Sequence, residues 1–169
     1  KDINFRPHRI KSGSTDISKD FIESLISHIK SSVKPVLYVG GGCLNSGLKA
    51  SEELIKFAEL TNIPVTTTLH GLGCYPGNGK LSIGMLGMHG TYEANLAMHN
   101  CDLMINVGAR FDDRITGRLD AFSPNSTKFH FDIDKSSINK NVNVDFSTNT
   151  DIAHALSALN LYIKSNNIE

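Results

Sequence analysis

The chain has 169 residues, of which 40% are hydrophobic and 20% charged, and its formal net charge is zero. A chain of this length is typical of one domain that buries a sizeable core without disulfides or metals. The even balance of charge gives no electrostatic reason to expect nucleic acid or an anionic membrane as a partner, and no apolar run approaches the roughly 20 residues of a spanning helix.

Both ends of the chain are polar. Lys1 to Asp16 predicts a linker from a preceding domain, and residues 165–169 predict a linker to a following one. Residue 1 is Lys, and no signal-peptide pattern follows it. The sequence therefore predicts that residues 17–164 form one domain of a longer chain.

The first half of that domain alternates between helix and strand patterns. Residues 18–32 predict a helix with one apolar stripe, and Pro35 ends it. The short apolar run 36–39 is typical of a buried parallel strand. A second helix is predicted over 50–60 and a β-branched strand over 63–68.

The second half continues the alternation after a long glycine-rich loop over 70–90. Thr91 is the expected cap of a helix over 91–99. Strands are predicted over 102–107 and 128–133, with a short further strand over 142–146. An amphipathic helix over 151–164 closes the domain.

Strands that alternate with helices predict βαβ units, and hence an α/β fold. We expect a doubly wound, mostly parallel sheet of about five to six strands with helices on both faces, a Rossmann-like (or DHS-like) nucleotide-binding fold. Ligands of such folds bind beyond the carboxyl ends of the strands. The glycine-rich and charged loops of this chain all follow predicted strands.

Two glycine-rich segments are candidate ligand contacts. Gly40-Gly41-Gly42 follows the first strand and allows backbone N–H groups to approach a ligand closely. The GxGxxG spacing is incomplete because Asn45 replaces the third glycine, so a tight strand-to-helix turn is the alternative. Residues 84–90 precede a helix, and their glycines make His89 a candidate contact.

Charged residues after the third and fourth predicted strands are further candidates. Arg110 and Arg114 are candidates to clamp a diphosphate, because a guanidinium group can bind a phosphate through two hydrogen bonds, and a surface ion-pair network is the alternative. Asp132 is well placed for a ribose or ribityl hydroxyl, whereas Asp134 or Ser136 is the expected cap of a following helix. No nucleophile-plus-base arrangement is visible, and no carboxylate pair can be assigned general acid and base roles from spacing.

The three cysteines, Cys43, Cys74 and Cys101, form neither a CxxC pair nor a zinc pattern. We interpret them as buried or loop thiols of a reducing cytosol. The cytosol is also the predicted location of the protein.

Several segments together resemble one family. Residues 35–46, the run Met85-Leu86-Gly87-Met88-His89-Gly90-Thr91, the run from Gly108 to Gly117 and the run His130-Phe131-Asp132-Ile133-Asp134 resemble the central domain of the acetolactate synthase (acetohydroxyacid synthase) large subunit, a thiamine-diphosphate enzyme. The resemblance covers roughly residues 33–160, and MLGMHGT followed by RFDDR is its most specific part.

The resemblance implies a three-domain enzyme that joins two 2-oxoacids, pyruvate with pyruvate or 2-oxobutyrate, with loss of CO₂, in the synthesis of branched-chain amino acids such as valine and isoleucine. Thiamine diphosphate and Mg²⁺ would be bound by the flanking domains, and FAD by this one, where it acts largely as a structural element. Asp113 and Arg114 match positions that line the substrate channel. The implied FAD contacts are Gly41, Thr68, Leu69, Leu86, Gly87, Met88, His89, Gly108, Ala109, Arg110, Phe111, Asp112, Asp132, Ile133 and Asp151.

The chain departs from the family pattern at Thr150, which replaces a glycine before Asp151, and at the insert-like stretch 47–51. The family's activating glutamate and its GDG…N metal motif belong to the flanking domains, so we expect no catalytic residue, no metal site and no synthase activity in this segment alone. The resemblance implies a homodimer or homotetramer, with or without a regulatory subunit. The alternatives are another thiamine-diphosphate carboligase and a non-catalytic NAD- or FAD-binding module.

Overall fold

The computed structural model describes residues 16–168, and its centre is one parallel sheet of six strands in the order β3-β2-β1-β4-β5-β6. Chain order therefore runs outward from β1 to one edge, and then from β4 to the other. The loops after β1 and β4 diverge where the direction reverses, which opens a crevice between them. The strands are β1 (Pro35–Val39), β2 (Val65–Thr67), β3 (Ser82–Met85), β4 (Leu103–Val107), β5 (Thr127–Asp132) and β6 (Phe146–Asn149).

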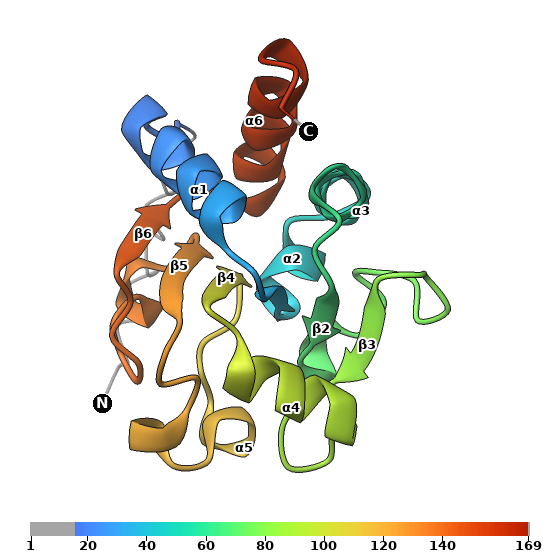
Figure 1. Cartoon of the computed structure of the whole chain (residues 1–169), viewed down its shortest axis with the longest axis vertical. Helices are drawn as coiled ribbons and strands as arrows, with labels where there is room; N and C mark the ends of the chain where they lie inside the picture. The colour runs from blue at the N-terminus through green and yellow to red at the C-terminus, as the bar shows by residue number, and fades with distance from the viewer. Residues whose placement is uncertain (1–15, 169) are drawn as a thin grey trace, which may run out of the picture.

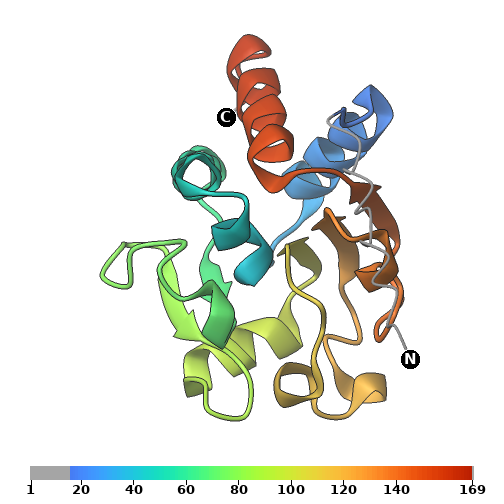
Figure 2. The ribbon, with the colours of Figure 1, turned by 180° about the vertical axis from the view of Figure 1, so that it is seen from behind.

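Helices cover both faces of the sheet. The long helices α1 (Lys19–Ser31), α3 (Leu48–Thr61) and α6 (Ile152–Ser165) lie on one face. The opposite face carries α4 (Tyr92–Asn100) and the short α5 (Asp113–Thr116) (Figures 1 and 2). The remaining short elements are α2 (Gly41–Asn45), η1 (Leu69–Gly71), η2 (Leu119–Ala121) and η3 (Lys135–Ser137).

The core consists of two apolar clusters, one on each side of the sheet. In β1, Leu37 and Val39 belong to the cluster beneath α1, α3 and α6, whereas Val36 and Tyr38 belong to the cluster beneath α4. This alternation follows from the two-residue period of a strand. Because both faces are covered, the strands are apolar on both sides, as expected for a parallel sheet.

Polar caps set the helix ends. The side chains of Ser18 and Thr91 accept hydrogen bonds from the N–H groups of Phe21 and Ala94, at the starts of α1 and α4. These bonds satisfy donors that have no partner within the helix, and they confirm the predicted cap at Thr91. The C-terminal end of α3 is marked by Asn62, which has a φ of 52°. This is the left-handed conformation that commonly ends helices.

The structure confirms the doubly wound parallel fold and the four predicted helices, α1, α3, α4 and α6. The predicted strand over 142–146 is wrong in position: β6 begins at Phe146 and pairs with β5. Val142 and Val144 pack instead against the cluster beneath α4. The strand β3 and the short helical elements α2, α5, η1 and η2 were not predicted. None of the helices within residues 16–168 has the length and apolar character needed to cross a membrane.

Candidate functional site

A cavity of about 720 Å³ opens at the carboxyl ends of β1, β2, β4 and β5. It lies at the point where the strand order reverses, the expected ligand position in this fold. Its walls come from the loops after these four strands, together with Asp151, which follows β6. Most of the predicted site residues line it: Gly41, Thr68, Leu69, Gly108, Ala109, Arg110, Asp112, Asp113, Arg114, Asp132, Ile133 and Asp151.

Five predicted site residues lie elsewhere. Phe111 is buried in the cluster beneath α4, with its ring centroid 5.5 Å from that of Tyr38. Leu86 is buried in the same cluster. Gly87, Met88 and His89 form a loop beside α5, and the Met88 N–H donates to the Arg114 carbonyl over 2.9 Å. This loop supports the backbone of Arg114 rather than lining the cavity.

The glycines after β1 and β4 allow two loops to pack backbone against backbone. A Cβ on Gly40 would lie 2.4 Å from the Gly108 carbonyl oxygen, and one on Gly42 would lie 2.8 Å from the Gly108 Cα. The Gly42 N–H donates to the Gly108 carbonyl over 3.0 Å. Gly108 itself has a φ of 66°, which glycine adopts without strain. The floor of the cavity therefore requires these glycines.

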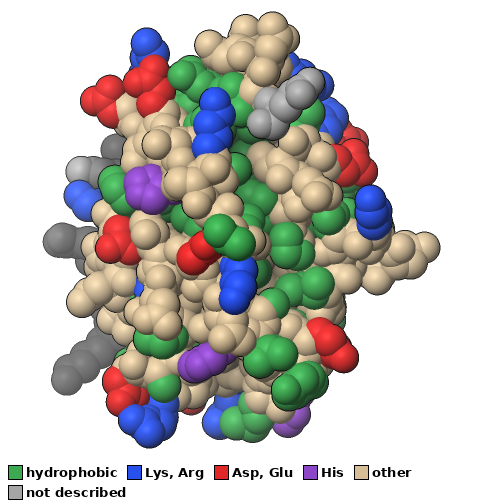
Figure 3. Space-filling model, in the orientation of Figure 1, with side chains coloured by type: hydrophobic (Ala, Val, Ile, Leu, Met, Phe, Trp, Pro, Cys, Tyr) green, Lys and Arg blue, Asp and Glu red, His purple; other side chains and the backbone are tan. Residues whose placement is uncertain are grey.

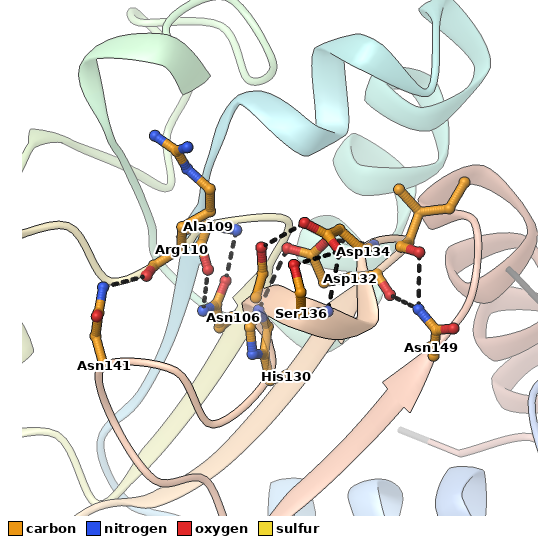
Figure 4. Close-up of polar contacts among 11 residues, drawn as sticks. Asn106, Ala109, Arg110, His130, Asp132, Asp134, Ser136, Asn141 and Asn149 are labelled. Atoms are coloured by element: carbon orange, nitrogen blue, oxygen red, sulfur yellow. Dashed lines mark hydrogen bonds and ion pairs between the residues drawn. The ribbon is translucent and has the colours of Figure 1, made fainter. Parts of the chain in front are cut away.

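Asn106 holds the turn that carries Ala109 and Arg110 into the cavity wall (Figure 4). Its side-chain amide donates to the Ala109 carbonyl over 2.7 Å and accepts from the Ala109 N–H over 2.9 Å. Asn141 donates to the carbonyls of Arg110 and Phe111 from the next loop. These residues fix the backbone of the turn, whereas the exposed Arg110 guanidinium is held by its pair with Asp112.

The charges at the cavity rim are paired and largely exposed. Arg110 bonds Asp112 over 2.9 Å, and Arg114 lies 3.9 Å from Asp113. Exposed pairs of this kind contribute only about 0–1 kcal/mol, so either guanidinium can exchange its carboxylate for an anionic ligand at small cost. Basic and acidic side chains are interspersed over the face seen in Figure 3, in agreement with the zero net charge.

The loop after β5 places Asp132 in the opposite wall. One oxygen of its carboxylate accepts from the Asp134 N–H over 2.8 Å, and the other lies 3.6 Å from His130 Nε2. Asn149 donates to the carbonyls of Asp132 and Ile133 and ties this loop to β6 (Figure 4). Asp134 caps η3 through Ser136, as predicted, and its hydrogen bonds with Ser136 lower the pKa of its carboxyl.

Asp151 caps the start of α6 at the edge of the cavity. Its carboxylate accepts from the His154 N–H over 3.2 Å and bonds the His154 ring over 3.1 Å. Burial acts to raise the pKa of this carboxyl, but the bonds from His154 and Ser46 outweigh burial and leave the pKa below its ordinary value. Asp151 is therefore a fixed negative charge at neutral pH.

This geometry accompanies a clear family relationship. Residues 22–159 match the family described as the thiamine pyrophosphate enzyme, central domain. The chain belongs to this family. The match lies inside the predicted 17–164 domain. The linkers predicted at residues 165–169 and at residues 1–16 stay predictions, and of the latter only Asp16 lies within the described residues.

Curated members of this thiamine pyrophosphate enzyme family include close relatives of the chain. It is 49% identical over 144 residues to the chloroplastic acetolactate synthase of Arabidopsis thaliana, covering 85% of this chain and 21% of that protein. Identity to the acetolactate synthase large subunit of Buchnera aphidicola is 51% over 131 residues, 78% of this chain and 23% of that one. Identity to the acetolactate synthase large subunit of Haemophilus influenzae is 54% over 111 residues, which cover 66% of this chain and 19% of that protein. The chain thus spans about a fifth of the length of these relatives.

Three buried polar residues at or beneath the cavity were not predicted from the sequence as site residues: Tyr38, Asn106 and His130. Among the described residues, the Tyr38 hydroxyl and both ring nitrogens of His130 have no hydrogen-bond partner. Burial and the charge of Asp112 raise the pKa of Tyr38 well above its ordinary value, so the phenol stays neutral. A polar residue within an apolar strand run was the available signal for all three.

Proposed function

We propose that this chain is the FAD-binding central domain of an acetolactate synthase, an enzyme that joins two 2-oxoacids with loss of CO₂. The observation that carries the proposal is the cavity at the strand-order reversal. Its walls are the very segments that resemble the acetolactate synthases, in a chain about half identical to curated enzymes of that name. A related carboligase of the same family is the alternative reading.

The residues of the cavity fit FAD. A volume of about 720 Å³ lies within the range of sites for large organic ligands. Gly41 presents no side chain to the cavity, where a Cβ would lie 3.0 Å from the Cβ of His70. Arg110 supplies donors for a diphosphate, and Asp132 supplies an acceptor for a sugar hydroxyl. FAD in this role supplies structural support to the enzyme rather than a redox step.

Asp113 and Arg114 have a different proposed role. Both lie at the cavity rim, at the start of α5, with side chains largely exposed. We place them on the substrate channel, where the guanidinium of Arg114 would attract the carboxylate of a 2-oxoacid. Met88 and His89 lie in the loop that supports Arg114 and do not line the cavity. They would contact only a part of FAD that extends beyond it.

The proposed enzyme is larger than this chain. Thiamine diphosphate and Mg²⁺ would be held by flanking domains, in a homodimer or homotetramer and with a regulatory subunit as a further partner. A cytoplasmic location also belongs to the proposal. Within residues 16–168, no three His, Cys, Asp or Glu side chains gather as a metal site, and the segment is expected to be inactive alone.

Titration of the purified 169-residue chain with FAD tests cofactor binding. We expect quenching of flavin fluorescence, with weaker affinity than in a complete enzyme because the proposed site extends beyond this segment. NAD⁺ at equal concentration should not compete. No change at high FAD concentration, or displacement by NAD⁺, would favour a different nucleotide module.

An activity assay tests the placement of the catalytic groups. The chain mixed with pyruvate, thiamine diphosphate, Mg²⁺ and FAD should form no acetolactate, whereas the complete polypeptide that contains it should do so. Acetolactate produced by the 169-residue chain would contradict the assignment of catalysis to flanking domains.

A further inference from the structure

Two buried thiols meet behind the floor of the cofactor cavity. Cys43 lies within α2 and Cys74 follows η1, and neither side chain has exposed surface. The Cys74 thiol lies 4.0 Å from the Gly40 carbonyl oxygen, which also accepts a hydrogen bond from the Cys43 N–H over 3.2 Å. The two cysteines therefore meet at this carbonyl, and each thiol influences the pKa of the other. Cys101 belongs to the cluster on the other side of the sheet, where it bonds Ser123. The chain therefore has one adjacent thiol pair and one isolated thiol.

A second cavity lies against Cys74. Its volume is about 310 Å³, and it lies between α3, β2, β3 and the loop that follows η1. Cys74 and Ser51 are part of its lining, together with apolar side chains such as Ile55 and Val65. The cavity therefore brings a small neutral oxidant next to Cys74, and a local opening, without unfolding of the domain, exposes the buried sulfur to it.

The surroundings of the two sulfurs shift the pKa values of the thiols in opposite directions. Hydrogen bonds from the Cys43 thiol, the Leu44 backbone and the Ser51 hydroxyl stabilise the Cys74 thiolate and lower the pKa of Cys74 despite its burial. The bond with Cys74 and burial raise the pKa of Cys43. A thiolate is the nucleophile in thiol oxidation, so Cys74 reacts first and Cys43 is poised to attack it in turn.

We propose that Cys43 and Cys74 are a redox modification site, which a hydroperoxide converts into an intrachain disulfide. The Cys74 thiolate attacks the terminal peroxide oxygen, the O–O bond breaks, and a sulfenic acid forms. The hydroxide or alkoxide that leaves takes up the proton that Cys74 lost and becomes water or an alcohol. The Cys43 sulfur then attacks the Cys74 sulfur, the S–O bond breaks, and the oxygen leaves as water with the Cys43 proton. In sum, two thiols and one hydroperoxide give one disulfide, one alcohol or water, and one further water.

The disulfide would join two walls of the cofactor cavity. Leu44, next to Cys43, and Leu69, at the start of η1, both line that cavity. A covalent link between α2 and the η1 loop would restrict the motion of these walls. We therefore expect the oxidised protein to melt at a higher temperature than the reduced protein, because the bond restricts the unfolded chain.

Mass spectrometry tests the proposal directly. The folded chain is treated with a small excess of hydrogen peroxide, alkylated, and digested with trypsin without reduction. The three cysteines fall on separate predicted peptides, 31–49, 57–80 and 81–110. We expect a linked species of the first two that is lighter than their sum by two hydrogens and disappears on reduction. Recovery of both peptides alkylated or sulfinylated, or a linkage that involves Cys101, would overturn the proposal.

Serine variants provide the matched comparison. Cys101→Ser should retain the linked species and the rise in melting temperature, whereas Cys43→Ser and Cys74→Ser should lose both. The wild-type peptide map decides the question even if one of these variants folds poorly. An oxidised wild-type protein that contains the disulfide in no more than a trace, with Cys43 still free, would contradict the site.

Discussion

At the scale of single residues, the cavity floor depends on the lack of a side chain at Gly40. Its φ of −111° suits any residue, so Gly40→Ala acts through the clash with Gly108 and Ala109 alone. Overpacking of this kind costs roughly 1–3 kcal/mol, and we expect that loss in the free energy of unfolding measured with urea. Gly77→Ala is the control, because nothing lies within 4 Å of its Cβ position. Equal stability of the two variants would contradict the close packing.

Asn106 offers a second test at this scale. Asn106→Ala leaves the N–H and carbonyl of Ala109 without their buried partner, and each such group costs about 1–3 kcal/mol, so we expect a total loss of roughly 2–6 kcal/mol. Chemical denaturation measures it. Asn100→Ala removes an exposed bond to Leu96 and should change stability by less than about 0.5 kcal/mol. A similar loss in both variants would show that Asn106 does not hold the turn.

At the scale of elements, the sequence predicts what local patterning controls. The apolar stripes of α1 and α6 and the apolar runs of β1 and β4 are visible in the residues themselves. The strand β3 escaped prediction because it lies in a glycine-rich stretch, where Gly84 has a φ of 87° and pairing with β2 alone makes it a strand. The expectation that ligands bind beyond the carboxyl ends of the strands located most of the cavity lining. The contact between Asn106 and Ala109 was not predicted, because it depends on a turn that no sequence pattern encodes.

The connection between α1 and β1 has a pH-dependent tie to β4. The Asp102 carboxylate accepts from the Ser32 hydroxyl and from the N–H groups of Val33 and Lys34, the latter two over 2.7 and 2.9 Å. Burial acts to raise the pKa of Asp102, but these bonds prevail and leave it below the ordinary value of 3.8. The contribution to stability is therefore complete at neutral pH and is lost as the pH falls through the lowered pKa.

We accordingly expect the free energy of unfolding of the wild type to fall more steeply between about pH 5 and pH 2 than that of Asp102→Asn. Urea titrations at several pH values measure the two slopes. Glu59→Gln, an exposed substitution on α3, controls for the loss of one negative charge. Parallel curves for wild type and Asp102→Asn would show that this tie contributes nothing to the acid sensitivity of the fold.

At the scale of the whole molecule, the two halves of the sheet share one cavity, the proposed ligand site. The loops after β1 and β2 form one side of the cavity, and those after β4 and β5 form the other. A ligand that contacts both sides binds only the folded chain, so it stabilises all elements together. At free FAD 100 times its dissociation constant this stabilisation is about 2.7 kcal/mol, which corresponds to a rise in melting temperature of roughly 5–10 °C for a chain of this size.

Substitution of one wall tests whether the ligand spans the reversal point. Asp132→Asn removes the charged acceptor but keeps the shape of the β5 loop, so it should diminish the rise in melting temperature at a fixed FAD concentration. Asp120→Asn, which alters only the exposed pair with Arg118, should retain the full rise. If both variants respond to FAD as the wild type does, the ligand does not engage the β5 side, and the glycine loops after β1 and β4 alone would have to hold it.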